Sequence, residues 1–427
     1  MPFNPGYTQG LFDSQTVSLN ATSTDDAKKV TYELWNLRNT YGLQMAQATH
    51  KAMTSDEYQF SAKRPFIVSE STFGATSGSY AAHVAAPNMR SYEWMRYSVA
   101  STLQLNMFGI PMSGADVCGT TGTRDDTLCA YWYQLGAFYP FARNNYIMGK
   151  DGNNEPTHIL DTAALAITKN AMMDRLKIVR YLYTKLFEAS TKGGAVFKPM
   201  FFYYANDTDA YFDHEQDFMV GDAIKVSPVL GEAATKGDAY TYTSYFPTME
   251  NEAWVNIFDF SDLQMTTADA VDAKVKTNQR NTISPKDHAN AYLRPGTILP
   301  MQETTYMVED PTTKLMVSKT AMSTADMVTY ASVDLLVNLD TNGQAQGSLL
   351  IDDGESRITL ENQLYDYYQF AYNKGSLKRE WATNGSGDGG FPDPDKEYGI
   401  VSANRVLNKI VLVNAKDKTV DFACWAD

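Results

Sequence analysis

The pattern of apolar residues changes its character near residue 235. Before this point, helix-like stretches alternate with short apolar runs, several of which end in polar residues. After it, short apolar runs follow one another with turn-forming residues between them. Strands that alternate with helices are typical of a parallel sheet with crossover helices, whereas closely spaced strands and turns are typical of an all-β unit. The sequence therefore predicts an α/β first part and an all-β second part.

The first part contains the expected helices and parallel strands. Helix-like stretches cover residues 27–53, 91–105 and 162–189. Strand-like runs cover residues 64–69, 106–116, 195–204 and 223–230. Polar residues at the C-terminal ends of parallel strands are where barrel enzymes build their sites. We therefore look for functional residues just after these runs.

The second part contains a strong turn signal. Asn342-Gly343 separates the strand-like runs 335–339 and 347–351, and this dipeptide predicts a β-hairpin. Further strand-like runs cover 363–372, 406–413 and 420–425, and a loop rich in Gly, Pro and Asp covers 383–395. We expect one or two β-sandwich domains in this part.

Length and charge exclude several classes of protein. A chain of 427 residues is too long for one core and predicts two or three domains. The net charge of −14 repels phosphates, so we expect no nucleic-acid partner and no docking on anionic membranes. No stretch reaches the roughly 18 apolar residues of a membrane span. The N-terminus lacks the features of a signal peptide, so either the protein is cytosolic or Met1 is not the start of the complete protein.

Cysteine usage bears on the compartment and on metal binding. The chain has three cysteines, Cys118, Cys129 and Cys424. The first two could close a short loop, and an oxidised pair would imply a secretory route. No CxxC motif or Cys/His cluster is present, so we expect no metal site and no cofactor. Three N-x-S/T sequons, at Asn20, Asn206 and Asn384, give weak support for secretion.

Seven strings, taken in order, are similar to strings of glycoside hydrolase family 31, which includes lysosomal and intestinal α-glucosidases and glucosidase II. They are RPFIVSESTF (64–73), FGIPMSGADVCG (108–119), YWYQLGAFYPFARN (131–144), AVFKPMF (195–201), AIKVSPVL (223–230), AYLRPGTILP (291–300) and SLLIDDGES (348–356). QLGAFYPFARN and GADVCG are the most distinctive. On these strings the chain is identified as a member of the family.

The resemblance implies a (β/α)₈ barrel followed by two β-sandwich domains, in agreement with the pattern above. The strings indicate that the chain starts just after barrel strand four. The expected domains are the C-terminal half of a TIM barrel at 1–232, a proximal β-sandwich at 233–310 and a distal β-sandwich at 311–427. The missing N-terminal half of the barrel is a candidate partner. The resemblance also implies that Cys118 and Cys129 pair.

The resemblance further implies where catalytic carboxylates would lie. Retaining glycosidases need one carboxylate as nucleophile and a second as acid and base. The family's nucleophile, the Asp of a W-x-D-M-N-E motif, has no counterpart in this chain. The family's acid/base, the Asp of an H-W-x-G-D string, falls at Pro87 of HVAAP, and proline has no proton to donate. We therefore expect no catalytic residue in this chain.

Four residues fall at or beside the family's substrate-binding positions, namely Asp116, Glu70, His83 and Asn145. Glu70 replaces the Arg of an S-R-S-T-F string, and Asn145 replaces the His of an R-N-H-N string. Further departures are Val84 in place of Trp and Thr120 in place of an aromatic residue. Five positions therefore depart together from the family's site, counting Pro87.

The change to Glu70 creates an electrostatic problem. In the family, the residue at Asp116 helps to hold the arginine that is replaced here. Two carboxylates would then face each other, unless one is protonated or a cation intervenes, and Arg90 is the nearest candidate in sequence. Alternatively, Glu70 turns to the solvent.

Three functional hypotheses remain open. The first is a relative of the retaining α-glucosidases, which hydrolyse O-glycosyl bonds, that is inactive alone and serves as a carbohydrate-binding or structural pseudoenzyme. The second is an α-glucosidase fragment whose partner segment supplies the nucleophile. The third is a truncated product without independent function. Any ligand would be a carbohydrate, an α-glucoside, and complete family members would be expected in the secretory pathway, lysosomal or extracellular.

Overall fold

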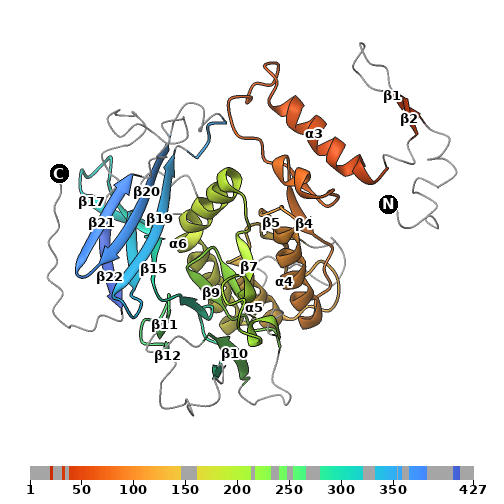
Figure 1. Ribbon diagram of the computed structural model, residues 1–427. Helices are drawn as coiled ribbons and strands as arrows, with labels where there is room; N and C mark the ends of the chain where they lie inside the picture. Colours follow the sequence, from red (N-terminus) through yellow and green to blue (C-terminus); the bar gives the residue numbers. More distant parts are fainter. Residues whose placement is uncertain are drawn as a thin grey trace.

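A computed structural model describes residues 20–22, 31–33, 38–145, 161–212, 217–231, 240–247, 253–265, 279–320, 332–352, 354–357, 365–381 and 407–413. The strand predicted at 420–425, the loop at 383–395, Cys424 and Asn384 lie outside these residues. An α/β part and a β-rich part lie side by side, with the long helix α6 (Thr162–Lys192) between them (Figure 1).

Four short strands form a parallel sheet in the order β3, β4, β5, β6. They are β3 (Val68–Ser69), β4 (Ala82–Ala85), β5 (Ser113–Val117) and β6 (Arg143–Asn144). The crossover helices α4 (Tyr92–Met107) and α5 (Asp126–Gly136) connect the last three strands. Parallel strands joined by helices in this order are the architecture of a barrel wall. The prediction of a partial (β/α)₈ barrel followed by β domains is confirmed.

Polar side chains cap the N-termini of α4, α5 and α6. Ser91 precedes α4, Asp125 precedes α5 and Asp161 precedes α6. In each case, the side-chain oxygen accepts a hydrogen bond from an amide of the first helical turn. These amides have no partner within a helix, so the caps stabilise the helix starts.

The N-terminal segment differs from the prediction. The stretch 27–53 is helical only in α3 (Tyr41–Met53), which follows the short helix η1 (Arg38–Thr40). Inside the predicted helix, β2 (Thr31–Glu33) pairs antiparallel with β1 (Asn20–Thr22). Threonine and tyrosine favour strands, and the pairing gives their backbone groups partners on a neighbouring strand instead of within a helix.

The first β-rich sheet has the strand order β12, β11, β14, β9, β8, β7, and its strand pairs are antiparallel. The strands are β7 (Phe197–Pro199), β8 (Phe218–Val220), β9 (Ile224–Val226), β11 (Ala253–Asn256), β12 (Leu263–Met265) and β14 (Ala291–Leu293). The runs 195–204 and 223–230 thus belong to an antiparallel sheet, whereas the sequence pattern grouped them with barrel strands. Both faces of β8 and β9 are buried, so these strands lack the alternation that distinguishes antiparallel strands in sequence.

The second β-rich sheet has the order β21, β20, β19, β15, β18, β22. Its strands are β15 (Thr297–Gln302), β18 (Val333–Asn338), β19 (Gln344–Asp352), β20 (Tyr365–Asn373), β21 (Ser376–Trp381) and β22 (Leu407–Val413). The turn predicted at Asn342-Gly343 is present, with Gly343 at a φ of 71°. The predicted hairpin is wrong, because β15 lies between β18 and β19. Gly347 permits this insertion, since a Cβ there would lie 2.3 Å from the Ile298 carbonyl oxygen.

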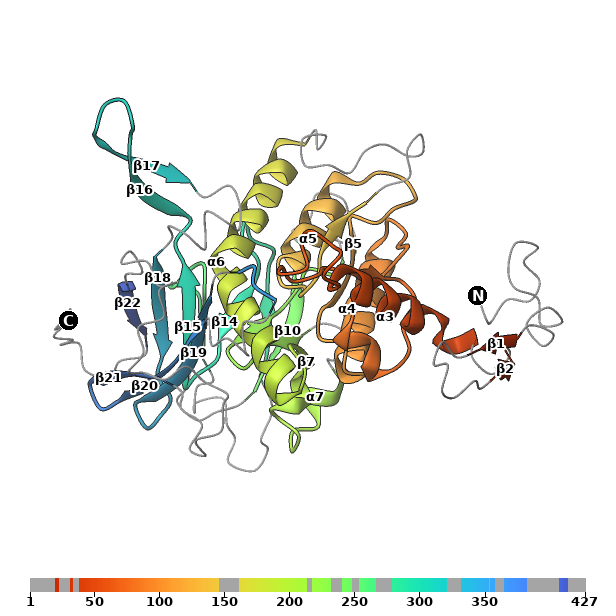
Figure 2. The ribbon, with the colours of Figure 1, turned by 90° about the horizontal axis from the view of Figure 1, so that it is seen from above.

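Smaller elements complete the described fold. Two further antiparallel pairs join β10 (Tyr242–Phe246) to β13 (Gln279–Ile283) and β16 (Thr305–Glu309) to β17 (Met316–Thr320). The short helices are η2 (Ala75–Ser79), η4 (Met200–Phe202) and α7 (Asp209–Phe212). Figure 2 shows β16 and β17 extending away from the second sheet. Within the described residues, no helix combines the length and apolarity that crossing a membrane requires.

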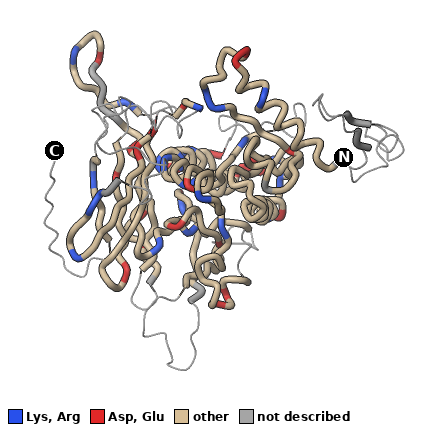
Figure 3. Tube along the Cα trace, turned by 45° about the horizontal axis from the view of Figure 1, so that its top comes forward, with Lys and Arg blue, Asp and Glu red and all other residues tan. Residues whose placement is uncertain are grey.

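Helix α6 joins the barrel part to both β-rich sheets. Basic and acidic positions are interspersed along the described chain (Figure 3), and several of them meet at this helix. Lys185 Nζ lies 2.8 Å from Asp222 Oδ1, in the turn between β8 and β9, and 3.1 Å from Ser348 Oγ of β19. Thr184 Oγ1 accepts the Leu350 amide of β19 at 3.0 Å. One helical turn therefore anchors both sheets.

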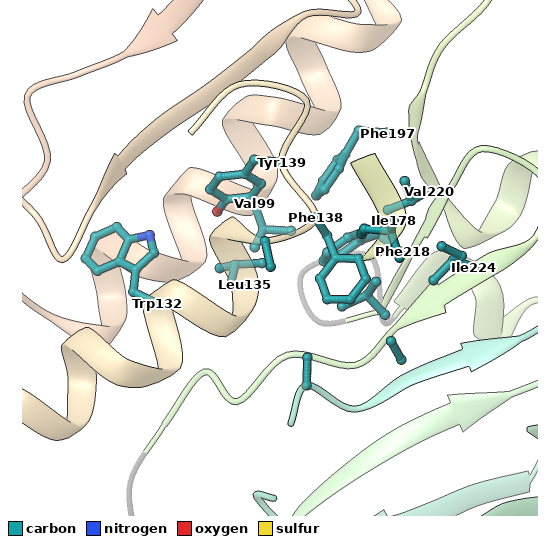
Figure 4. Packing of buried hydrophobic residues seen from close by; sticks show 14 of the residues in the cluster. Val99, Trp132, Leu135, Phe138, Tyr139, Ile178, Phe197, Phe218, Val220 and Ile224 are labelled. Carbon is teal, nitrogen blue, oxygen red and sulfur yellow. The ribbon is translucent and has the colours of Figure 1, made fainter. Parts of the chain in front are cut away.

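A single apolar core extends from the barrel part into the first β-rich sheet. Figure 4 shows α5 residues and the chain that follows α5 packed against rings from β7 and β8. The Tyr139 ring centroid lies 5.7 Å from that of Phe197, and Phe197 lies 4.0 Å from Phe218. All three side chains are fully buried. This packing holds the segment that leads into β6 and so positions Arg143, the first residue of that strand.

Candidate functional site

The candidate residues follow or end the parallel strands. Glu70 follows β3, Pro87 follows β4, Asp116 lies in β5 and Arg143 begins β6. Because the strands are parallel, their carboxyl ends meet at one edge of the sheet. Asn145 follows β6 at the same edge and is exposed.

Arg143 lies between the two carboxylates of this edge. Its Nε donates to Asp116 Oδ1 at 2.6 Å, and a terminal guanidinium nitrogen lies 3.8 Å from Glu70 Oε1. The hydrogen bond to Asp116, together with the charges of both carboxylates, raises the pKa of Arg143. The structure therefore places a cation between Glu70 and Asp116. An intervening cation was one of the alternatives that the sequence left open for these two carboxylates.

That cation is Arg143, whereas the sequence offered Arg90 as the nearest candidate. Arg90 is buried and donates from Nη1 to the Gly122 carbonyl at 3.0 Å. Sequence distance favoured Arg90, whereas the pairing of β5 with β6 brings Asp116 opposite Arg143. Arg143 lies in the string QLGAFYPFARN, so a search for cations within the distinctive strings would have found it. The Glu70 side chain is also 60% exposed, so it both faces the solvent and approaches Arg143.

The segment that follows β4 also holds Asp116 in place, through Asn88. Its side chain is fully buried, and its backbone amide donates to Asn88 Oδ1 at 3.1 Å. The carbonyl of Asn88 in turn accepts both the amide and the hydroxyl of Thr120. No hydrogen-bond donor among the described residues reaches Asp116 Oδ2. One oxygen of Asp116 is therefore fixed by Arg143, and the other is a buried acceptor.

His83 and Pro87 lie in and after β4. His83 Nδ1 lies 3.1 Å from Thr72 Oγ1, in the string that follows β3. Burial lowers the pKa of His83, which favours the neutral imidazole. Pro87 lies two residues after Ala85, the last residue of β4, and a proline side chain has no titratable group.

The loop after β5 is tied back to α5. The sulfurs of Cys118 and Cys129 are bonded, with their Cα atoms 4.4 Å apart. Cys118 and Gly119 have φ values of 69° and 73°, which form a tight turn at the end of β5. A Cβ at Gly119 would lie 2.9 Å from Met89 backbone atoms, so only glycine fits this contact. The turn keeps Asp116 and the strand end in place.

The residues at this edge differ from a hydrolytic pair of carboxylates. Retaining glycosidases place two carboxyl groups about 5–5.5 Å apart, one of which must hold a proton. Here Asp116 accepts a hydrogen bond from Arg143, and Glu70 lies 3.8 Å from the same guanidinium. The described residues contain no group of three or more His, Cys, Asp or Glu placed to hold a metal ion. The edge presents a partly exposed guanidinium, which Asp116 orients, and the exposed residues Glu70 and Asn145.

Sequence comparisons match the chain to one family in two consecutive segments. The TIM-barrel domain of the glycosyl hydrolases of family 31 matches residues 11–185, and the C-terminal domain of that family matches residues 193–299. The chain is 35% identical over 323 residues to a probable alpha-glucosidase of Oryza sativa subsp. japonica, covering 75% of this chain and 32% of the relative. It is 31% identical over 381 residues to the lysosomal alpha-glucosidase of Mus musculus, covering 88% of this chain and 36% of the relative.

Solved structures show the same fold. The glucosidase II alpha subunit superposes with a TM-score of 0.69 at 22% identity, over 82% of this chain and 34% of that chain. A family 31 alpha-glucosidase from Bacteroides thetaiotaomicron superposes with a TM-score of 0.60 at 24% identity, over 88% of this chain and 52% of that chain. The chain thus spans about a third of the length of the two sequence relatives above. Both family domains follow one another here in order, and the chain belongs to glycoside hydrolase family 31.

Proposed function

We propose that the strand ends around Arg143 form part of a binding site for α-glucosides, and that this chain alone does not hydrolyse them. The observation that carries the proposal is Pro87 at the end of β4. General acid catalysis typically contributes about 10²–10⁴-fold to such reactions, and proline cannot supply it. The chain would then act as a carbohydrate-binding or structural member of a hydrolase family.

The neighbouring carboxylates do not replace the missing acid. Asp116 is fully buried and its Oδ1 accepts a 2.6 Å hydrogen bond from Arg143, so its carboxyl group is not exposed to a leaving group. Glu70 lies within 3.8 Å of the same guanidinium. A catalytic pair would also have to be held to about half an ångström, and the Glu70 side chain is mostly exposed.

Binding remains chemically favourable at this edge. The Arg143 side chain is 34% exposed, so its guanidinium can reach hydroxyl groups while Asp116 fixes its orientation. Asn145 lies beside it, and His83 is a candidate partner from β4. Asp116, Glu70, His83 and Asn145 are therefore our proposed substrate-binding residues, with Arg143 added to them.

The compartment and the wider assembly follow from the same family. The Cys118–Cys129 bond suits an oxidising compartment, and a relative from Mus musculus is described as lysosomal. We therefore assign the chain to the secretory pathway, lysosomal or extracellular. Among the described strands, β3 and β6 are the outer strands of the parallel sheet, which suits a partner that supplies further barrel strands.

The domain limits also stay a proposal. The sequence suggested 1–232, 233–310 and 311–427, but β7 to β9 pair with β11 and β14 in one antiparallel sheet. The C-terminal domain of the family begins its match at residue 193. We therefore propose that the first limit lies near residue 193, directly after α6.

The deciding experiment combines hydrolysis with binding. Purified chain is incubated with an aryl α-glucoside, and we expect no release of the chromophore. Calorimetry with methyl α-glucoside should detect binding that Arg143→Met weakens by about tenfold or more, since a hydrogen bond to a charged group is lost. Arg379→Met, in β21, is the matched control and should bind normally.

Two outcomes would change the proposal. Hydrolysis that vanishes in Asp116→Asn would show that Glu70 and Asp116 form a new catalytic pair. Absence of binding, or equal binding in Arg143→Met, would reject the sugar-binding role of this edge. In a chain completed with the first half of the barrel, Pro87→Asp should restore hydrolysis if the missing acid is the cause of inactivity.

A further inference from the structure

A surface turn of the first β-rich domain carries a complete N-glycosylation sequon. The sequon is Asn206-Asp207-Thr208, in the segment between η4 and α7. Both Asn206 and Thr208 are exposed. An acceptor asparagine must lie on the surface to carry a bulky glycan in the folded protein. This sequon meets that condition, on an edge of the molecule that the barrel site does not use.

The middle residue of the sequon anchors the turn to the protein. Asp207 Oδ1 accepts the Asp209 amide at 3.0 Å, and the Asp207 amide donates to the Tyr204 carbonyl at 3.0 Å. The hydroxyl of the buried Tyr245 donates to Asp207 Oδ2. Asp207 therefore holds the turn, while Asn206 before it and Thr208 after it stay at the surface.

Exposed aromatic rings border the same turn. The Tyr211 ring is 45% exposed, and its hydroxyl donates to the Ala205 carbonyl, directly before Asn206, at 3.0 Å. Tyr211 stacks on Phe201 with centroids 5.0 Å apart and an interplanar angle of 1°. Phe202 is also 46% exposed. Aromatic rings fixed beside Asn206 offer an apolar surface on which the C–H face of an attached sugar can pack.

We propose that Asn206 carries an N-linked glycan whose first sugar packs on Tyr211 and covers the exposed rings around it. The inference rests on the secretory compartment proposed above. The donor is a lipid-diphosphate-linked oligosaccharide, used by the transferase of that compartment. The Asn206 amide nitrogen forms a bond to the anomeric carbon and loses one proton, while the bond from that carbon to the diphosphate oxygen breaks. The lipid diphosphate leaves with the electron pair of the broken bond.

The test uses the full chain, produced through the secretory pathway of a eukaryotic cell and purified. Mass spectrometry of the peptide that contains Asn206 should show an attached N-acetylhexosamine core, removable by an N-glycosidase. Asn206→Gln and Thr208→Ala should each lose one glycan, as a step in apparent mass. Thr208→Ser keeps the sequon and should keep the glycan, so it is the matched control.

The outcomes separate the site from the compartment. An unmodified Asn206 together with glycans on Asn20 or Asn384 would overturn the site and leave the compartment standing. An unmodified chain with free Cys118 and Cys129, isolated from its natural source, would reject both. For the packing, enzymatic deglycosylation should lower the Tm of the wild type, and this difference should shrink in Tyr211→Ala. An equal difference in both proteins would overturn the packing on Tyr211.

Discussion

Two buried aspartates, one in each part of the molecule, show how a structural carboxylate differs from one at the proposed binding site. Asp217 lies in the first β-rich domain, and Lys225 Nζ lies 3.0 Å from its Oδ1. The side chains of the pair are 1% and 0% exposed. Asp217 also accepts the Ser244 hydroxyl and the Tyr245 amide, the latter at 2.6 Å on Oδ2. Both of its oxygens are thus used inside the protein.

Asp116 of the barrel part is equally buried but differently partnered. Its Oδ1 accepts Arg143, whereas none of the described residues donates to its Oδ2. Its cation is 34% exposed and extends toward Glu70, whereas Lys225 has no exposed surface. The closed network around Asp217 serves the fold, and the open one around Asp116 leaves a guanidinium available to a ligand.

The largest expected effect is in the closed network. Asp217→Ala leaves the Lys225 ammonium buried without its carboxylate, and we expect a loss of about 3–5 kcal/mol in the free energy of unfolding. Asp116→Ala should cost less, about 1–3 kcal/mol, because the partly exposed Arg143 regains water when its hydrogen bond is lost. Urea unfolding of both variants measures the difference. Equal losses would show that exposure of the cation does not separate the two networks.

The next effect concerns the loop that supports the open network. Replacing both Cys118 and Cys129 by alanine should lower the free energy of unfolding by about 3 kcal/mol, because the unfolded chain is no longer constrained. The same change should weaken methyl α-glucoside binding, since the loop after β5 positions Asp116. Cys424→Ala is the control. A stable double variant with unchanged binding would show that the bond supports neither the fold nor the site.

The barrel part could be predicted well from sequence, and the β-rich part less well. The strings RPFIVSESTF and GADVCG placed Glu70 and Asp116 at strand ends, where the structure has them, whereas β4, which precedes Pro87, was not predicted. Arg143 was missed because its role depends on the pairing of β5 with β6, which no local pattern records.

The β-rich part shows the same limitation on a larger scale. The Asn342-Gly343 dipeptide predicted its turn correctly, because turn geometry is a local property. The insertion of β15 between β18 and β19 depends on contacts distant in sequence, such as the approach of Ile298 to Gly347. The grouping of the strands around residues 195–230 failed for a similar reason, since short buried strands read alike in parallel and antiparallel sheets.

The smallest predicted effect is a pH dependence at the junction of the two parts. His288, just before β14, has its Nδ1 2.8 Å from Oδ2 of the buried Asp174 of α6. The hydrogen bond to Asp174 raises the pKa of His288 above 6.5, and burial raises the pKa of Asp174. Both shifts mean that the folded state binds protons more tightly than the unfolded chain. The stability from His288 is therefore present below about pH 6.5 and is lost as the pH rises through its folded pKa.

His83 in the barrel part provides the opposite case and hence the control. Burial lowers its pKa, so its contribution is present above about pH 6.5 and is lost as the pH falls below this value through the lowered pKa of the folded state. Urea unfolding at about pH 6 and about pH 8 should show that His288→Gln loses more stability relative to wild type at the lower pH. The difference should stay below about 1 kcal/mol, because the His288 side chain is 38% exposed and solvent screens the pair. His83→Gln should instead gain relative stability at the lower pH. If lowering the pH changed the relative stability of both variants in the same direction, the opposite pKa shifts assigned to His288 and His83 would be contradicted.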